Sequence, residues 1–166
     1  ILFAGSFTLV LLLLVLVPIN SEATNDIIVF FGNFHPLILH LPIGALIGVF
    51  LLEIVNIIKP QLNLNNANKV LLWFSAISLI PAVVFGFFLA STGGYNSEVL
   101  GFHKWLGWFT ALLCVWLLVF RLWAYSKNKN HIKAYQLFLF INVVLLSFTG
   151  HYGGTLTHGS NYLTKD

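Results

Sequence analysis

The chain has 166 residues, of which 58% are hydrophobic and only 8% are charged. Soluble globular proteins contain about 25% charged residues, so this composition excludes a soluble domain. The excess of apolar residues also excludes a disordered chain. The net charge of +3 rests on eight Lys and Arg residues without a basic tract, so no nucleic-acid partner is expected. We therefore expect an integral membrane protein whose surroundings are the lipid bilayer.

Five apolar segments are long enough to cross a bilayer as helices, because a span needs about 20 residues, with a range of roughly 17 to 25. They cover residues 1–17, 35–58, 70–90, 101–124 and 134–150. The sequence thus predicts an all-α integral membrane protein with five transmembrane helices. Residues 1–20 form the expected N-terminal helix, which we interpret as retained because no A-x-A cleavage site follows it.

Residues 21–150 are expected to hold the core four-helix bundle, preceded by a segment along the outer interface. Gly32 and Asn33 offer a break in the chain, and Pro36 suits the first turn of a helix, so the second span should begin at His35. Residues 151–166 are interpreted as a Gly- and His-rich tail that leaves the last helix at Gly150. No internal repeat is apparent along the chain.

The cationic residues predict the orientation of the bundle. Six of the eight lie at the connections between spans two and three and between spans four and five, which predicts that these connections are cytoplasmic. They are Lys59, Lys69, Arg121, Lys127, Lys129 and Lys133. The N-terminus is then cytoplasmic and the C-terminus periplasmic, in the inner membrane of a bacterium. The same orientation gathers five of the six histidines at the periplasmic end of the bundle.

Histidines at one depth in the bilayer predict a cofactor site. At about 1.5 Å per residue, His40 lies roughly 8 Å further along its helix than His35, level with His103 and His151. Two imidazoles from facing helices can ligate a haem iron from both sides. We expect His40 and His103 to ligate a b-type haem, with His151 and His35 as alternates. His158 is expected to contact a propionate or a partner.

Two glycines favour the same interpretation. Gly44 follows His40 by four residues and Gly107 follows His103 by four, so each glycine lies one turn inward on the face of a histidine. A missing side chain there would let a flat porphyrin lie close to the helix backbone. Covalent attachment is excluded because the single cysteine, Cys114, cannot form a C-x-x-C-H motif.

Other interpretations of these residues stay open. The glycines also fit the small-residue pattern of helix packing, and interfacial histidines can simply bond to water and headgroups. A zinc or copper site built from three or more histidines is a further alternative. At the opposite end, Glu53 and Arg121 occupy one layer of the bundle and are expected to pair, either structurally or as part of a proton path.

Three stretches of the sequence resemble the signatures of an uncharacterised bacterial integral-membrane domain. They read F-H-P-L-I-L-H-L-P-I-G over residues 34–44, H-K-W-L-G over residues 103–107 and G-H-Y-G-G-T-L-T-H-G over residues 150–159. In that family the membrane domain is often followed by a periplasmic c-type cytochrome domain. The resemblance implies a redox setting, with the cytochrome either beyond residue 166 or in a separate subunit.

We therefore hypothesise a membrane redox subunit of an oxidoreductase complex, which passes electrons between quinol and a periplasmic c-type cytochrome or other membrane subunits. No catalytic residue is expected, because acidic residues are too few for hydrolytic acid–base chemistry. The main alternative is a cofactor-free structural anchor of a larger complex. A metal or proton-coupled transporter is disfavoured, because such proteins are built from repeats that are not apparent here.

Overall fold

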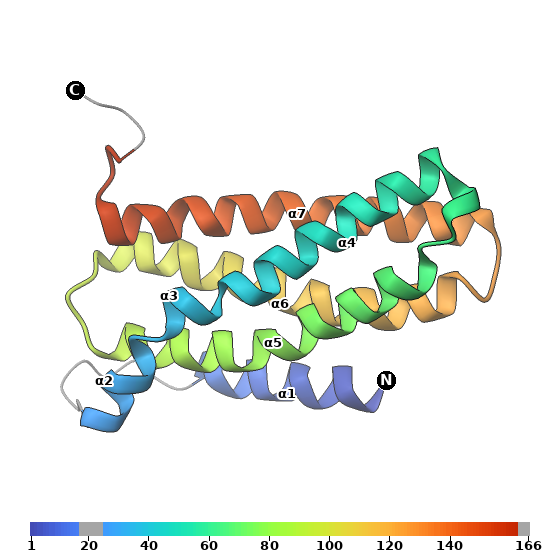
Figure 1. Ribbon diagram of the computed structural model, residues 1–166. Coiled ribbons are helices and arrows are strands. Elements are labelled where there is room, and N and C mark those ends of the chain that lie inside the picture. Colours follow the sequence, from blue (N-terminus) through green and yellow to red (C-terminus); the bar gives the residue numbers. More distant parts are fainter. Residues whose placement is uncertain (17–24, 163–166) are drawn as a thin grey trace.

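The computed structural model describes residues 1–16 and 25–162, and all regular secondary structure in these ranges is helical (Figure 1). The predicted all-α class is therefore confirmed. The helices are α1 (Leu2–Leu16), α2 (Asp26–Gly32), α3 (His35–Ile38), α4 (His40–Ile58), the short 3-10 helix η1 (Pro60–Leu62), α5 (Asn65–Ser91), α6 (Ser97–Ala124) and α7 (Lys129–His158).

Four helical segments in the described part of the chain are long and apolar enough to cross a membrane. The first is Asp26–Ile58, which runs through α2, α3 and α4, and the others are α5, α6 and α7. These four segments are the predicted core bundle. Helix α1 is apolar but shorter, and it packs against α6, where Trp108 Nε1 donates to Leu11 O at 3.3 Å and Trp116 Nε1 donates to Thr8 Oγ1 at 3.0 Å.

The helices of the bundle alternate in direction, which gives it two distinct ends (Figure 1). The α4–α5 and α6–α7 connections lie at one end, which we call the Glu53 end because it holds Glu53 and Arg121. The α5–α6 connection and the end of α7 lie at the other end, which we call the histidine end because it holds His35 and His103. Each end brings together side chains that are distant in the sequence.

The break between α2 and α3 falls where the sequence predicts it. Gly32 ends α2, and a Cβ at this position would lie 2.8 Å from the backbone nitrogen of Leu89, so α2 can pack this closely on α5 only with a glycine. Pro36 lies in the first turn of α3. A backbone N–H at this position has no partner within the helix, so the helix loses no hydrogen bond to the proline. His35 is therefore positioned at the start of α3.

Helix α7 continues through His158, so the prediction that the chain leaves the helix at Gly150 is wrong. Glycine in a helix interior costs about 1 kcal/mol relative to alanine, which is why three glycines in five residues predicted an end. Tertiary packing outweighs this cost, because the Tyr152 ring stacks on the Phe102 ring of α6 with 5.3 Å between centres. The helix ends at Gly159, whose φ of 88° suits glycine.

The helix pairs α4–α5 and α6–α7 repeat one pattern of buried positions that was not apparent from the sequence. Adding 68 to the number of a buried residue in α4 gives the equivalent buried residue in α6. Adding 67 gives the equivalent residue in α7 for a residue in α5. Both pairs run in the same direction, so the repeat is parallel and its axis lies along the bundle. Equivalent buried positions are Leu46 and Cys114, Val49 and Leu117, Glu53 and Arg121, Asn68 and Tyr135, Leu72 and Leu139, and Ser75 and Asn142.

Hydrogen bonds between the helices repeat as well. Ser75 Oγ donates to Pro42 O at 3.1 Å, which joins α5 to α4. At the equivalent positions, the Asn142 amide lies 3.2 Å from Thr110 O and donates to it when the amide is assigned so that both of its polar atoms are satisfied, which joins α7 to α6. The repeat is therefore a property of the packing, and each half contributes equivalent positions to both ends of the bundle.

Candidate functional site

Two of the predicted histidines face each other at the histidine end. His35 begins α3, and His103 lies in the second turn of α6, 68 residues later. Their ring centres are 6.4 Å apart, with 76° between the ring planes. Both side chains are half-buried. They occupy equivalent positions in the two halves of the repeat, so the axis of the repeat passes between them.

Each ring is held by a hydrogen bond to a backbone carbonyl on the neighbouring helix. His35 Nδ1 lies 2.9 Å from Ala82 O on α5, and His103 Nδ1 lies 2.9 Å from Thr149 O on α7. A carbonyl oxygen only accepts, so Nδ1 must donate and carry the proton in both rings. Nε2 of each neutral ring then keeps its lone pair, which is the state in which imidazole binds a metal.

Each ring also lies against a glycine, four residues after the carbonyl to which it bonds. A Cβ at Gly86 would lie 2.8 Å from His35 Cε1, and a Cβ at Gly153 would lie 3.1 Å from His103 Cε1. A side chain at either position would displace the ring from its carbonyl. Gly86 and Gly153 therefore belong to the site. The sequence analysis missed Gly86 and saw Gly153 only as part of a Gly-rich stretch, although their 67-residue separation is a usable signal.

The predicted first ligand, His40, lies elsewhere. It is exposed, and its Nδ1 bonds with Pro36 O in α3, four residues earlier. Gly44, one turn further along, is also exposed, and a Cβ there would meet nothing within 4 Å. Among the described residues, the histidine that the structure brings to His103 is the alternate, His35. Gly107 faces α7, where a Cβ would meet Thr149 Cγ2 at 3.5 Å, so it serves helix packing one turn from His103.

His151 and His158 lie on an exposed face of α7, outside the facing pair. The Tyr162 side chain packs between them, with its hydroxyl 3.4 Å from His151 Nδ1 and its ring centre 6.0 Å from each imidazole. Within residues 1–16 and 25–162, no group of three or more His, Cys, Asp or Glu side chains is arranged to hold a metal ion. A zinc or copper site with three such ligands therefore has no counterpart in this part of the chain.

Glu53 is the centre of a buried polar cluster at the opposite end. Its side chain is 2% exposed. Oε2 accepts a hydrogen bond from Asn68 Nδ2 at 2.7 Å, and Oε1 accepts from Tyr125 Oη at 2.7 Å and Gln136 Nε2 at 2.9 Å. Asn68 lies in α5, Tyr125 directly follows α6 and Gln136 lies in α7, so each of the other three core helices supplies one donor. A buried carboxylate needs such bonds to offset the loss of hydration, and here they also tie the four helices together.

Arg121 completes this cluster without binding the Glu53 carboxylate directly. It is 3% exposed, its Nη2 donates to Asn65 O at 3.0 Å, and its Cζ lies 4.3 Å from the centre of the Tyr125 ring. The predicted direct pair is therefore replaced by a network in which Tyr125 contacts both charged groups. The hydrogen bonds to the Glu53 carboxylate come instead from Asn68, Tyr125 and Gln136.

Comparison with known proteins relates the chain to a family of membrane proteins. A family model described as a predicted membrane protein (DUF2231) matches residues 32–164. This range includes the facing histidines, the two glycines beside them and the Glu53 cluster. The match confirms the resemblance drawn from the three sequence stretches. No curated protein and no solved structure matches the chain.

Proposed function

The chain belongs to the DUF2231 family of predicted membrane proteins, and we propose that it is a membrane redox subunit that holds a b-type haem between His35 and His103. One observation carries the proposal: the two imidazoles lie 6.4 Å apart between ring centres, and each bonds to a backbone carbonyl through Nδ1 and not through Nε2. Haem ligated on both sides has no open position for oxygen, which suits electron transfer.

The separation of the rings supports this assignment. Imidazole nitrogens bind metals at about 2.0–2.1 Å, so a metal between two Nε2 atoms separates the ring centres by roughly 6 Å. The observed separation is 6.4 Å. A protein zinc site ordinarily uses three or four protein ligands, whereas a haem iron needs only two from the protein. The pair therefore fits haem better than it fits a zinc ion.

The distribution of charge supports the proposed orientation of the bundle across the membrane. The Glu53 end carries Lys59, Lys69, Arg121, Lys127, Lys129 and Lys133. Connections rich in Lys and Arg stay in the cytoplasm, so the histidine end would face the periplasm of a bacterial inner membrane. The chain would then begin in the cytoplasm and α7 would end at the periplasmic face.

This orientation is compatible with a membrane quinol and a periplasmic cytochrome as electron-transfer partners. A haem at the histidine end would lie within reach of a membrane quinol and of a periplasmic c-type cytochrome. Oxidation of a quinol to a quinone releases two electrons and two protons. His35 and His103 would hold the haem, and the haem would supply the one-electron chemistry that connects this two-electron donor to a one-electron acceptor such as a ferric cytochrome. The two protons would leave to the periplasm.

The first test is an absorption spectrum of the protein purified in mild detergent from cells supplied with a haem precursor. We expect a Soret band, with sharp α and β bands after dithionite reduction. His35→Ala and His103→Ala should each abolish these bands, whereas the control variants His40→Ala and His151→Ala should keep them. A colourless wild-type protein would refute the proposal and leave the anchor role. Stoichiometric zinc or copper in its place would assign the pair to a metal ion.

A further inference from the structure

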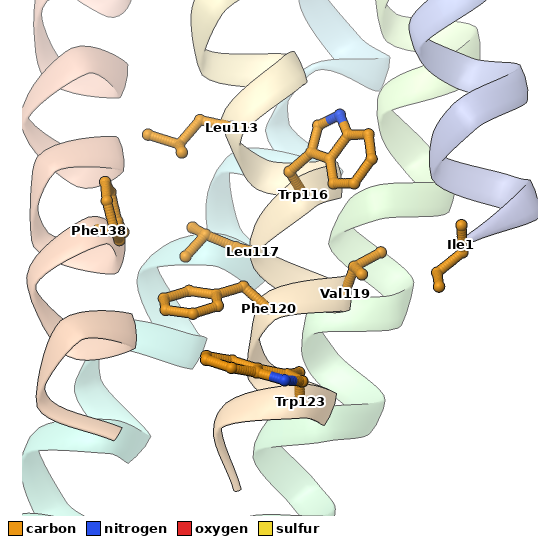
Figure 2. A pocket seen from close by; sticks show the side chains of 8 residues that line it. All are labelled: Ile1, Leu113, Trp116, Leu117, Val119, Phe120, Trp123 and Phe138. Carbon is orange, nitrogen blue, oxygen red and sulfur yellow. The ribbon is translucent and has the colours of Figure 1, made fainter. Parts of the chain in front are cut away.

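An apolar groove runs along the outside of the bundle toward the Glu53 end. Its floor is α6, and Figure 2 shows that Phe138 of α7 and Ile1 before α1 flank it on opposite sides. The groove has a volume of ≈ 410 Å³, and the eight side chains that line it are all aliphatic or aromatic. Trp116, Trp123 and Phe138 are each more than 40% exposed within it.

The length of the groove matches one leaflet of a bilayer. On α6 it extends from Leu113 to Trp123, a distance of about 15 Å at 1.5 Å per residue. The hydrocarbon core of a bilayer is about 30 Å thick, so this is half of it. Trp123 lies one residue before the end of the helix, at the level where tryptophans meet the headgroups. An acyl chain that enters at Trp123 therefore reaches the end of the groove at the bilayer midplane.

The mouth of the groove is basic. The Trp123 ring contacts the ring of His131 in the first turn of α7, with 4.5 Å between centres. Lys127 lies in the α6–α7 connection and Lys129 begins α7, and both are exposed. Residues 125–133 contain no Asp or Glu to neutralise them. A negatively charged headgroup at this level would meet cations, while its acyl chain would meet hydrocarbon.

We propose that the groove, the α6–α7 connection and the first turn of α7 together form a binding site for an anionic phospholipid. The acyl chain lies on α6 between α1 and α7, and the phosphate binds at Lys127, Lys129 and His131. Lysines beside a membrane span strengthen binding to anionic lipid by about fivefold each. This site is at the opposite end of the bundle from His35 and His103, so it does not depend on the haem proposal.

The test is native mass spectrometry of the full chain in detergent with phosphatidylglycerol or phosphatidylcholine of identical acyl chains. We expect the protein to retain phosphatidylglycerol more strongly. The double variant Lys127→Gln with Lys129→Gln should weaken phosphatidylglycerol binding by about 30-fold and leave phosphatidylcholine binding unchanged. The matched control is Lys59→Gln with Lys69→Gln, which removes two lysines from the same end of the bundle but outside the groove.

A third variant tests the acyl-chain part of the site. Val119→Phe fills the groove without changing any charge and should weaken the binding of both lipids. Equal retention of the two lipids would overturn the proposal, as would equal losses in the two lysine variants or unchanged binding in Val119→Phe. Release of the bound lipid by inorganic phosphate would assign the cations to a free anion and also overturn it. Circular dichroism and melting curves establish that each variant is folded.

Discussion

A methyl group added at Gly86 tests the geometry of the histidine pair. The new Cβ would lie 2.8 Å from Cε1, 3.0 Å from Nδ1 and 3.3 Å from Nε2 of His35. Ordinary contact between carbon atoms is about 3.5–4.0 Å, so the ring would have to retreat by roughly 1 Å. That movement would take Nδ1 out of its 2.9 Å bond with Ala82 O.

The expected loss of stability follows from three contributions. Overpacking costs about 1–3 kcal/mol, and the lost hydrogen bond costs about 0.5–1.5 kcal/mol. Alanine is favoured over glycine within a helix by about 1 kcal/mol, which offsets part of this. Gly86→Ala should therefore destabilise the protein by about 2 kcal/mol. Gly153→Ala should act in the same direction but less strongly, because its nearest contact, His103 Cε1, is 3.1 Å away.

Gly150→Ala is the matched control on α7. A Cβ at Gly150 would meet nothing within 4 Å, so this variant gains helix propensity without a clash. Thermal melting in detergent should rank the proteins Gly150→Ala, wild type, Gly153→Ala and Gly86→Ala, from most to least stable. The ratio of Soret to protein absorbance should fall only in the last two. If Gly86→Ala keeps both its melting temperature and its haem, the His35 ring does not lie against this glycine and the derived geometry is wrong.

The Glu53 cluster and the α2–α5 contact give further tests by thermal melting. Tyr125→Phe removes a hydroxyl that donates to Glu53 and should cost about 1–3 kcal/mol, whereas Tyr135→Phe removes a buried hydroxyl without a hydrogen-bond partner and should be neutral or stabilising. The opposite ranking would contradict this network. Glu53→Ala leaves three donors without an acceptor and should lower the melting temperature further than Tyr125→Phe. Gly32→Ala should destabilise the protein by about 1–3 kcal/mol, because the new Cβ would clash with the α5 backbone. The control, Gly44→Ala, should not, because Gly44 faces open space. Equal melting temperatures of the two variants would show that α2 does not pack this closely on α5.

The membrane-embedded, all-helical architecture could be predicted from the sequence because it depends on local properties. Within hydrocarbon each span must satisfy its own backbone hydrogen bonds, so a long apolar run specifies a helix whatever its neighbours are. The break at Gly32 and the start of α3 at His35 are equally local, since they follow from the backbone preferences of Gly and Pro. At the end of α7, by contrast, local preference gave the wrong prediction. There the contact between the Phe102 and Tyr152 rings, which is not local in the sequence, outweighs the helix-breaking preference of the glycines.

The partner of His103 was decided only by tertiary structure. Sequence position fixes the depth of a residue along a helix, and by depth His40 was the better match. Five residues also turn a helix by about 140°, so His35 and His40 cannot both face the axis of the bundle. Helix packing turns His35 inward and leaves His40 exposed. The repeat was hidden for a related reason: equivalent positions such as Glu53 and Arg121 share their burial and not their chemistry, and burial exists only once the helices have packed.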